Sequence, residues 1–170
     1  MATVRCIRTE INVLKTAKKH PFLIGLYAFY QTLRKYWIIH RDIKPESILL
    51  DRKSHVKLGN FAYCKEGIAK GDKVNGFYGT IPYMAPEIMR NEYYDFSVDW
   101  YSFGVVLYEL LIGPVYLLGS DEATSRYYQT ILLGPWSVSV EATSILNGFL
   151  NMNPEERLGG KTRRKSRKWF

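Results

Sequence analysis

The chain has 170 residues, which argues for one domain and part of a second. Hydrophobic residues make up 46% and charged residues 24%, and these values argue against wholesale disorder, collagen and coiled coil. The two cysteines, Cys6 and Cys64, give no disulfide framework and no cysteine-based zinc site, and they suit a reducing compartment. The most apolar stretch, residues 103–118, is interrupted by Glu109 and is too short to span a bilayer comfortably. We therefore expect no transmembrane segment and a cytoplasmic protein, with the nucleus as the alternative.

The net charge of +8 is unevenly distributed. Residues 1–44 carry nine basic and two acidic side chains, residues 45–160 carry nine basic and fourteen acidic ones, and residues 161–170 carry six basic ones and none acidic. A basic tail of this kind can bind a polyanion such as nucleic acid, serve as a nuclear address or contact an anionic membrane. The alternative is a solvated end, because a terminal charge run usually has no fixed partner.

Local patterns in the first part of the chain predict one helix and several short strands. Residues 9–19 have helical spacing of their apolar side chains, and Pro21 should end that helix. Residues 22–31 are apolar and aromatic and favour one or two strands. Ile48–Leu50 and Val56–Leu58 flank a polar stretch, which predicts two strands around a turn.

The rest of the chain is predicted to be mainly helical. Residues 65–80 contain several glycines and little periodicity, so we expect a loop there. Residues 97–112 form a long apolar pattern typical of a helix that is buried on most sides. Residues 141–151 predict a second helix. Its apolar face would hold Ile145, Leu146, Phe149 and Leu150.

Five motifs follow one another in a fixed order. Residues 40–47 read His-Arg-Asp-Ile-Lys-Pro-Glu-Ser, and residues 57–62 read Lys-Leu-Gly-Asn-Phe-Ala. Residues 79–87 read Gly-Thr-Ile-Pro-Tyr-Met-Ala-Pro-Glu, and two more motifs lie at 97–105 and 153–159. In this order they resemble the catalytic loop, the metal-binding segment, the end of the activation segment, the central helix and the late arginine turn of protein kinases.

The sequences of these motifs resemble those of the AGC group of Ser/Thr protein kinases, with ribosomal-protein kinases and protein kinase C as the most similar types. Lys44, two residues after Asp42, is the Ser/Thr-kinase pattern. The resemblance implies an α+β, protein-kinase-like fold whose mainly α-helical large lobe comprises residues 33–160. Residues 1–32 would be a remnant of the small lobe, with its C-helix and the following strand, and residues 161–170 a basic tail.

The resemblance also implies catalytic roles for Asp42 and Lys44. Asp42 would accept or orient the proton of a substrate hydroxyl, and Lys44 would neutralise the transferring phosphate. A protein is the expected partner, either as a substrate or as a binding partner. The alternative for Asp42 is that its side chain only accepts hydrogen bonds from loop backbone.

The positions for ATP and magnesium depart from the family pattern. The family's catalytic-loop asparagine is Ser47 here, and the aspartate of its metal-binding segment is Asn60. Magnesium prefers carboxylate oxygens and phosphates, and both of these side chains are neutral. Ala62 replaces a glycine whose backbone freedom it lacks. We therefore expect ATP and magnesium to bind weakly or not at all.

Parts of the nucleotide pocket are also expected to be missing. Glu10 matches the C-helix glutamate, but neither its lysine partner nor a Gly-rich loop precedes it. Only five residues lie between Thr32 and Ile38, where the family has a strand, the adenine-binding hinge and two helices. Five residues span about 18 Å at most when extended, so these elements cannot fit.

The regulatory positions are partly lost. Gly76 stands where the family carries its phosphorylated threonine, so Arg41 has lost its usual phosphate partner. Thr80 remains at the position that contacts the catalytic aspartate and lysine in the family.

The scaffold positions are retained. Glu87 and Arg157 match the buried ion pair that ties the activation segment to the large lobe. Asp99 matches the carboxylate that accepts hydrogen bonds from the catalytic-loop backbone. Because the architecture is kept while the chemistry is eroded, the leading hypothesis is a kinase-like binding module with little or no activity. The alternatives are an active ATP-dependent Ser/Thr protein kinase and a truncated product without function.

Overall fold

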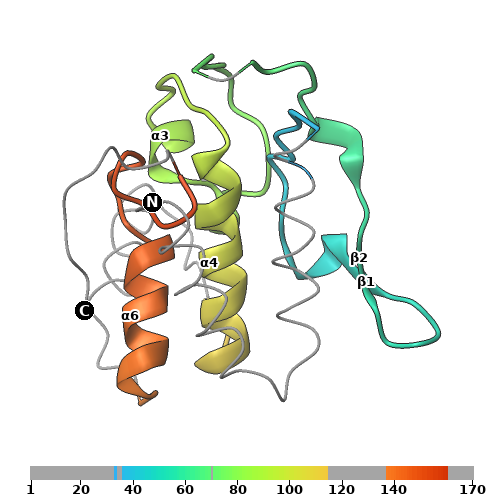
Figure 1. The fold of residues 1–170 in the computed structure, drawn as a ribbon, viewed down its shortest axis with the longest axis vertical. Coiled ribbons are helices and arrows are strands. Elements are labelled where there is room, and N and C mark those ends of the chain that lie inside the picture. Colours follow the sequence, from blue (N-terminus) through green and yellow to red (C-terminus); the bar gives the residue numbers. More distant parts are fainter. Residues whose placement is uncertain (1–32, 34–35, 70, 115–136, 161–170) are drawn as a thin grey trace, which may run out of the picture.

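A computed structural model describes residues 33, 36–69, 71–114 and 137–160 of the chain. These residues form a mainly helical unit with one small sheet at its edge (Figure 1). The helix predicted over residues 9–19, the strands predicted over 22–31 and the basic tail lie outside the described residues. Within the described ranges, no helix has the length and apolar character needed to cross a membrane.

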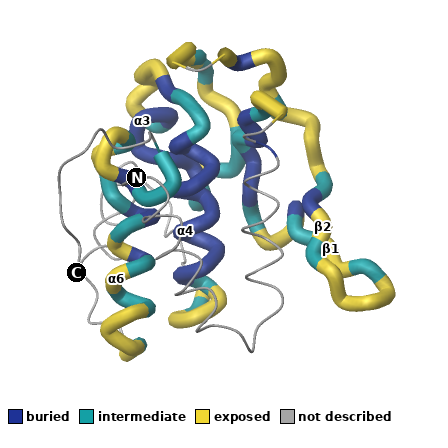
Figure 2. The backbone as a smooth tube through the Cα atoms, in the orientation of Figure 1, coloured by how far each residue is buried: buried dark blue, intermediate teal, exposed yellow. Residues whose placement is uncertain are grey.

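Helix α4 (Ser97–Leu111) forms the centre of the core, as the long apolar pattern predicts, and it ends one residue before the predicted boundary. Every residue from Ser97 to Tyr108 is buried, so the helix contacts protein on all sides along most of its length (Figure 2). Asp99 in its first turn is favoured by the positive end of the helix dipole.

Helix α6 (Val140–Phe149) packs alongside α4 (Figure 1). It begins one residue earlier than predicted and ends two residues earlier, and its N-cap is Ser139, whose hydroxyl accepts a hydrogen bond from the third helical residue. Gly104 allows the close approach of the two helices, because a Cβ at this position would lie 2.8 Å from the Cβ of Phe149. Of the predicted apolar face of α6, Leu146, Phe149 and Leu150 are buried and Ile145 is half-buried.

The two predicted strands form an antiparallel hairpin with the predicted boundaries. Strand β1 (Ile48–Leu50) pairs with β2 (Val56–Leu58), and Ile48 lies opposite Leu58. Asp51 closes the turn, because its carboxylate accepts hydrogen bonds from the backbone N–H groups of Lys53 and His55. The hairpin projects from the body of the unit, and much of its surface is exposed (Figure 2).

Four short helical elements were not predicted from the sequence patterns. They are the 3₁₀ turns η1 (Pro45–Ser47), η2 (Phe61–Tyr63) and η3 (Ile81–Tyr83) and the helix α3 (Pro86–Met89). Each is three or four residues long, which is too short to show a periodic pattern. Residues 65–80 form a loop, as predicted, over the part that the structure describes.

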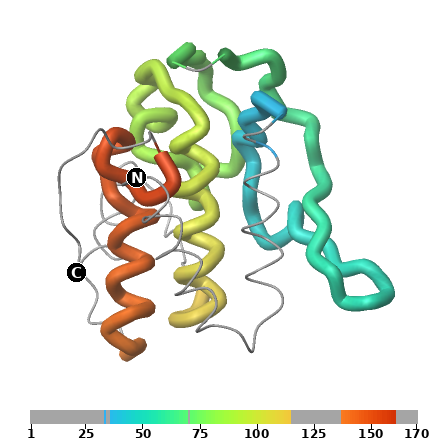
Figure 3. The backbone as a smooth tube through the Cα atoms, viewed as in Figure 1, coloured from blue at the N-terminus to red at the C-terminus, as the bar shows by residue number. Residues whose placement is uncertain are grey.

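The segments that carry the first three motifs meet around residues 40–47, beside α4. Figure 3 shows residues 36–50 running beside this helix, and the chain then passes through the hairpin and returns over the end of the unit as the loop that leads to α3. Backbone bridges between Ile39 and Lys65 and between Val74 and Tyr94 fix the two ends of this loop. Segments far apart in the sequence are thereby brought together around residues 40–47.

Candidate functional site

The backbone of residues 40–47 is anchored to the start of α4. The Asp99 carboxylate accepts hydrogen bonds from the backbone N–H groups of His40 and Arg41, both at 2.8 Å. Arg41 has a φ of 67°, so the chain turns sharply at this point. Burial raises the pKa of Asp99 to about 6 and outweighs the two backbone hydrogen bonds, which act in the opposite direction.

The carboxylate of Asp42 is buried and surrounded by three side chains. Its Oδ1 accepts a hydrogen bond from the Thr80 hydroxyl at 2.6 Å. Its Oδ2 accepts one from the Asn60 side-chain amide at 2.9 Å and lies 3.2 Å from the Lys44 ammonium. Lys44 also donates to the Thr80 hydroxyl at 2.8 Å. Among the described residues, the contacts of this carboxylate come from side chains, whereas the alternative interpretation of Asp42 expects contacts from loop backbone.

The side chain of Ser47 points back toward the backbone of residues 40–47. Its side chain is buried, and its hydroxyl donates to the backbone carbonyl of Asp42 at 2.8 Å. The carbonyl of Ser47 accepts a hydrogen bond from the N–H of Gly59, also at 2.8 Å, which joins the loop to the residue that follows β2. The Ser47 hydroxyl therefore stabilises the turn between Asp42 and Ser47.

Asn60 occupies a left-handed backbone conformation, with φ 60° and ψ 58°. Asparagine tolerates this region better than most residues do. The conformation directs the side-chain amide toward Asp42, eighteen residues earlier in the chain. The next residue, Phe61, packs edge-on against the His40 ring at 5.2 Å between centroids, and Ala62 is exposed.

His40 links residues 40–47 to Gly59, the residue after β2, a role that its place in the motif did not predict. Its Nε2 lies 3.0 Å from the carbonyl of Gly59, and its Nδ1 accepts the backbone N–H of Asp42 at 3.3 Å. This pair of contacts requires the neutral ring with the proton on Nε2, because Nδ1 serves as an acceptor. Burial lowers the pKa of His40, which favours the same neutral form.

The Arg41 side chain has aromatic partners that the sequence patterns did not reveal. Its Nε donates to the backbone carbonyl of Tyr63 at 2.5 Å, and its Nη1 donates to the Tyr94 hydroxyl at 3.4 Å. The guanidinium lies over the Tyr78 ring, with 4.2 Å between its Cζ and the ring centroid. These residues come from three separate segments, so no local pattern could have grouped them.

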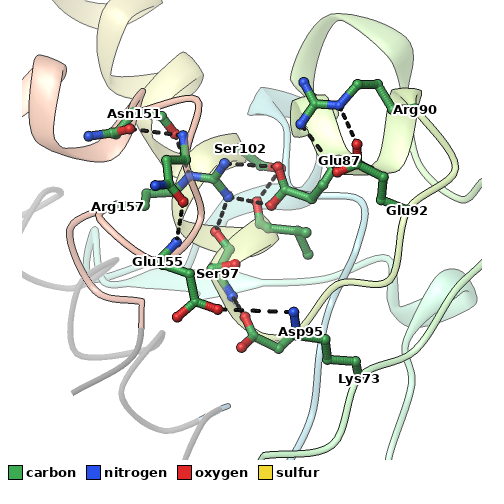
Figure 4. Close-up of polar contacts among 12 residues, drawn as sticks. Lys73, Glu87, Arg90, Glu92, Asp95, Ser97, Ser102, Asn151, Glu155 and Arg157 are labelled. Atoms are coloured by element: carbon green, nitrogen blue, oxygen red, sulfur yellow. Dashed lines mark hydrogen bonds and ion pairs between the residues drawn. The ribbon is translucent and has the colours of Figure 1, made fainter. Parts of the chain in front are cut away.

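Glu87 and Arg157 form a buried bidentate ion pair (Figure 4). The two guanidinium nitrogens lie 2.6 and 2.9 Å from the two carboxylate oxygens. Arg157 also donates to the backbone carbonyls of Ser97 and Asn151. The pair therefore ties α3, the start of α4 and the segment after α6 into one unit.

An apolar cavity of about 440 Å³ opens between residues 40–47, the hairpin and α4. Its walls include Ile48, Leu50, Val106 and Leu110. Leu50 and Leu110 are both more than half exposed, at 59% and 54%. The carboxylate of Glu109 also lies in the wall and accepts a hydrogen bond from the Tyr83 hydroxyl at 2.9 Å.

The family described as "Protein kinase domain" matches residues 32–170. The chain belongs to this family. The described helices and hairpin are therefore part of a protein-kinase-like fold, as the order of motifs predicted. Glu10 and the basic tail lie outside the described residues.

Several curated relatives place the chain among AGC-type Ser/Thr kinases. It is 38% identical to the atypical protein kinase C of Drosophila melanogaster over 208 aligned residues, covering 90% of this chain and 34% of the relative. It is 34% identical to the protein kinase C zeta type of Oryctolagus cuniculus over 206 residues, covering 90% and 35%. It is 36% identical to the serine/threonine-protein kinase Sgk3 of Rattus norvegicus over 203 residues, covering 91% and 40%. The chain thus spans roughly a third of the length of these relatives.

Proposed function

We propose that this AGC-type kinase domain does not carry out magnesium-dependent phosphoryl transfer and acts by binding a protein partner. The observation that carries the proposal is the environment of Asp42. Both oxygens of its carboxylate accept contacts from side chains of the same chain, and one of these comes from Asn60, at a family metal-ligand position. The contact from Asn60 is the one that departs from an arrangement suited to phosphoryl transfer, because it puts an amide donor where the family places a metal ligand.

The donor set fits Mg²⁺ poorly. Asn60 directs its amide nitrogen, a hydrogen-bond donor, at Asp42, and it supplies no negative charge. The Ser47 hydroxyl is buried and donates to a backbone carbonyl. Magnesium is usually held through one or two carboxylates together with substrate phosphates. Neither position supplies such a carboxylate.

The internal length of the chain supports the same proposal. Each aligned stretch is longer than the 170 residues of this chain, so the relatives contain residues within the stretch that this chain lacks. We place the missing residues in the interval of five residues between Thr32 and Ile38. ATP would then find no hinge to hydrogen-bond its adenine. The apolar cavity beside the loop is consistent with the loss of helices that would otherwise cover it.

The test is nucleotide binding by the purified chain. Thermal unfolding is followed with ATP alone, with Mg²⁺ alone and with both, beside a catalytically complete AGC kinase domain as the positive control. A ligand that binds the folded state raises the melting temperature by mass action. We expect no shift that requires both ATP and Mg²⁺. A saturable shift that needs both ligands would contradict the proposal.

An active Ser/Thr protein kinase is the second candidate, and one observation favours it. Asp42, Lys44 and Thr80 form a compact triad with contacts of 2.6 to 3.2 Å, the arrangement that phosphoryl transfer would need. A truncated product without function is the third reading. It predicts that the chain does not fold cooperatively on its own, which unfolding measurements would detect.

The division of the chain and the role of its basic tail belong to the same proposal. Residues 33–160 would be the large lobe and residues 1–32 a small-lobe remnant, in a protein that we place in the cytoplasm or nucleus. The six basic side chains of residues 161–170 would give salt-sensitive attraction to polyanions. Unchanged retention on heparin after removal of residues 161–170 would show that the tail is only a solvated end.

A further inference from the structure

Three tyrosines surround the Arg41 side chain, and we call Tyr63, Tyr78 and Tyr94 the tyrosine cluster. Arg41 donates to the backbone of the first, stacks on the ring of the second and donates to the hydroxyl of the third. The rings of Tyr63 and Tyr78 also lie 6.2 Å apart. A guanidinium stacks well on an aromatic face because it is planar and weakly hydrated.

Tyr94 of the cluster contacts the loop that precedes Thr80. Tyr94 is buried, and its hydroxyl donates to the backbone carbonyl of Gly76 at 3.1 Å. Its backbone exchanges two hydrogen bonds of 2.8 Å with Val74. Both contacts hold the N-terminal end of residues 76–80 against the body of the unit.

The outgoing end of this segment is held against Arg41 itself. Gly79 has a φ of 121°, and a Cβ there would lie 2.4 Å from the Arg41 carbonyl oxygen, so only glycine permits this approach. The next residue, Thr80, donates to Asp42 and accepts from Lys44. The position of Thr80 in the site therefore depends on how residues 76–80 are held.

We infer that the tyrosine cluster fixes residues 76–80 on Arg41 without a phosphate group, which makes Tyr78 and Tyr94 positioning residues for the Asp42 site. The inference rests on the proposed function in taking Asp42, Lys44 and Thr80 as the site. Gly76 has no hydroxyl that could be phosphorylated. The segment is accordingly held in place without phosphorylation at position 76.

The test measures hydrogen exchange of the hydrogen-bonded amides at the two ends of the segment, those of Val74 and Tyr94, which bond to each other, and that of Tyr83, which donates to the Thr80 carbonyl. Tyr78→Ala removes the ring and should raise exchange about tenfold, because opening costs less free energy once the stacking on Arg41 is lost. Tyr78→Phe keeps the ring and should restore protection close to that of the wild type. Tyr94→Phe removes the hydroxyl that bridges Arg41 and Gly76 and should also raise exchange. Phe77→Ala is the matched control, since Phe77 is 52% exposed and adjacent, and it should change little.

Two results would overturn the inference. One is wild-type protection in Tyr78→Ala, and the other is faster exchange after phosphatase treatment of protein purified from cells. If Tyr78→Ala fails to fold, the Arg41 Nε–H resonance of the wild type decides. Stacking on the ring predicts an upfield shift that Tyr78→Phe keeps, and an unshifted resonance contradicts the inference. Neither readout uses ATP, so failure here and failure of the proposed loss of phosphoryl transfer are distinguishable.

Discussion

The side-chain amide of Asn60 donates a hydrogen bond to Oδ2 of Asp42, with 2.9 Å between the two atoms. This contact joins the residue at the family's metal position to the residue at its catalytic position. An amide can donate such a bond, whereas an ionised carboxylate in the same place could not. The hydrogen bond from Asn60 thus supports the proposal that this position does not hold a metal ion.

Asn60→Asp should destabilise the fold at neutral pH. The change removes the hydrogen bond and places two carboxylates side by side, so we expect a loss of about 1 kcal/mol in the free energy of unfolding at pH 7. Mutual repulsion raises the pKa of one carboxyl in the folded state, so the loss should shrink as the pH falls toward 4. Urea unfolding at pH 7 and pH 4.5 measures this. Asn60→Gly is the control, because it loses the bond without adding charge and glycine accepts the left-handed backbone conformation of this position. An Asn60→Asp variant as stable as the wild type at pH 7 would contradict the prediction.

Glu87→Gln should be strongly destabilising. The substitution keeps the volume of the side chain but leaves the buried Arg157 guanidinium without its charge partner. Breaking a buried ion pair from one side typically costs about 3–5 kcal/mol. Urea unfolding of the variant measures the loss. Glu92→Gln provides the comparison, since Glu92 pairs with Arg90 at the surface and its removal should change stability little. Equal effects of the two substitutions would argue against a scaffold role for the buried pair.

His40 should make stability fall on acidification. Burial holds the pKa of His40 in the folded state below its usual 6.5, so the unfolded chain takes up a proton first as the pH drops. The contribution of His40 is therefore fully present above about pH 6.5 and is lost as the pH falls through the lowered pKa of the folded state. We expect the free energy of unfolding to decline more steeply over this interval in the wild type than in His40→Asn. The prediction would be contradicted if the free energy of unfolding of the wild type rose relative to that of the variant on acidification.

The sequence predicted the hairpin and the two long helices because each rests on a local pattern. Ile48–Leu50 and Val56–Leu58 are apolar runs around a polar turn, and α4 is apolar along most of its length. The ion pair of Glu87 with Arg157 followed from the family resemblance. The aromatic partners of Arg41 and the bond from Asn60 to Asp42 could not be predicted. They depend on how separate loops converge and on side-chain conformations that no spacing in the sequence encodes.

The apolar cavity should make the chain prone to self-association. Leu50 and Leu110 in its wall are more than half exposed, and exposed apolar patches favour association. The double substitution Leu50→Lys with Leu110→Lys should shift the chain toward monomer in sedimentation velocity and lower the fluorescence of a bound apolar dye. Val140→Lys is the control, because Val140 is 82% exposed and lies outside the cavity lining. A wild type that is monomeric, with a cooperative melt well above about 60 °C, would contradict this prediction.

An assay of phosphoryl transfer by the purified chain is the direct test of the proposed loss of activity. The assay uses radiolabelled ATP, Mg²⁺ and peptides rich in serine and basic residues, with the wild type, Asp42→Ala and the double variant Ser47→Asn with Asn60→Asp. We expect no transfer above background from any of the three proteins. The double variant rebuilds metal ligands without rebuilding the adenine pocket, so it should not gain activity. Transfer by the wild type that Asp42→Ala abolishes would contradict the proposed loss of activity and establish an active kinase.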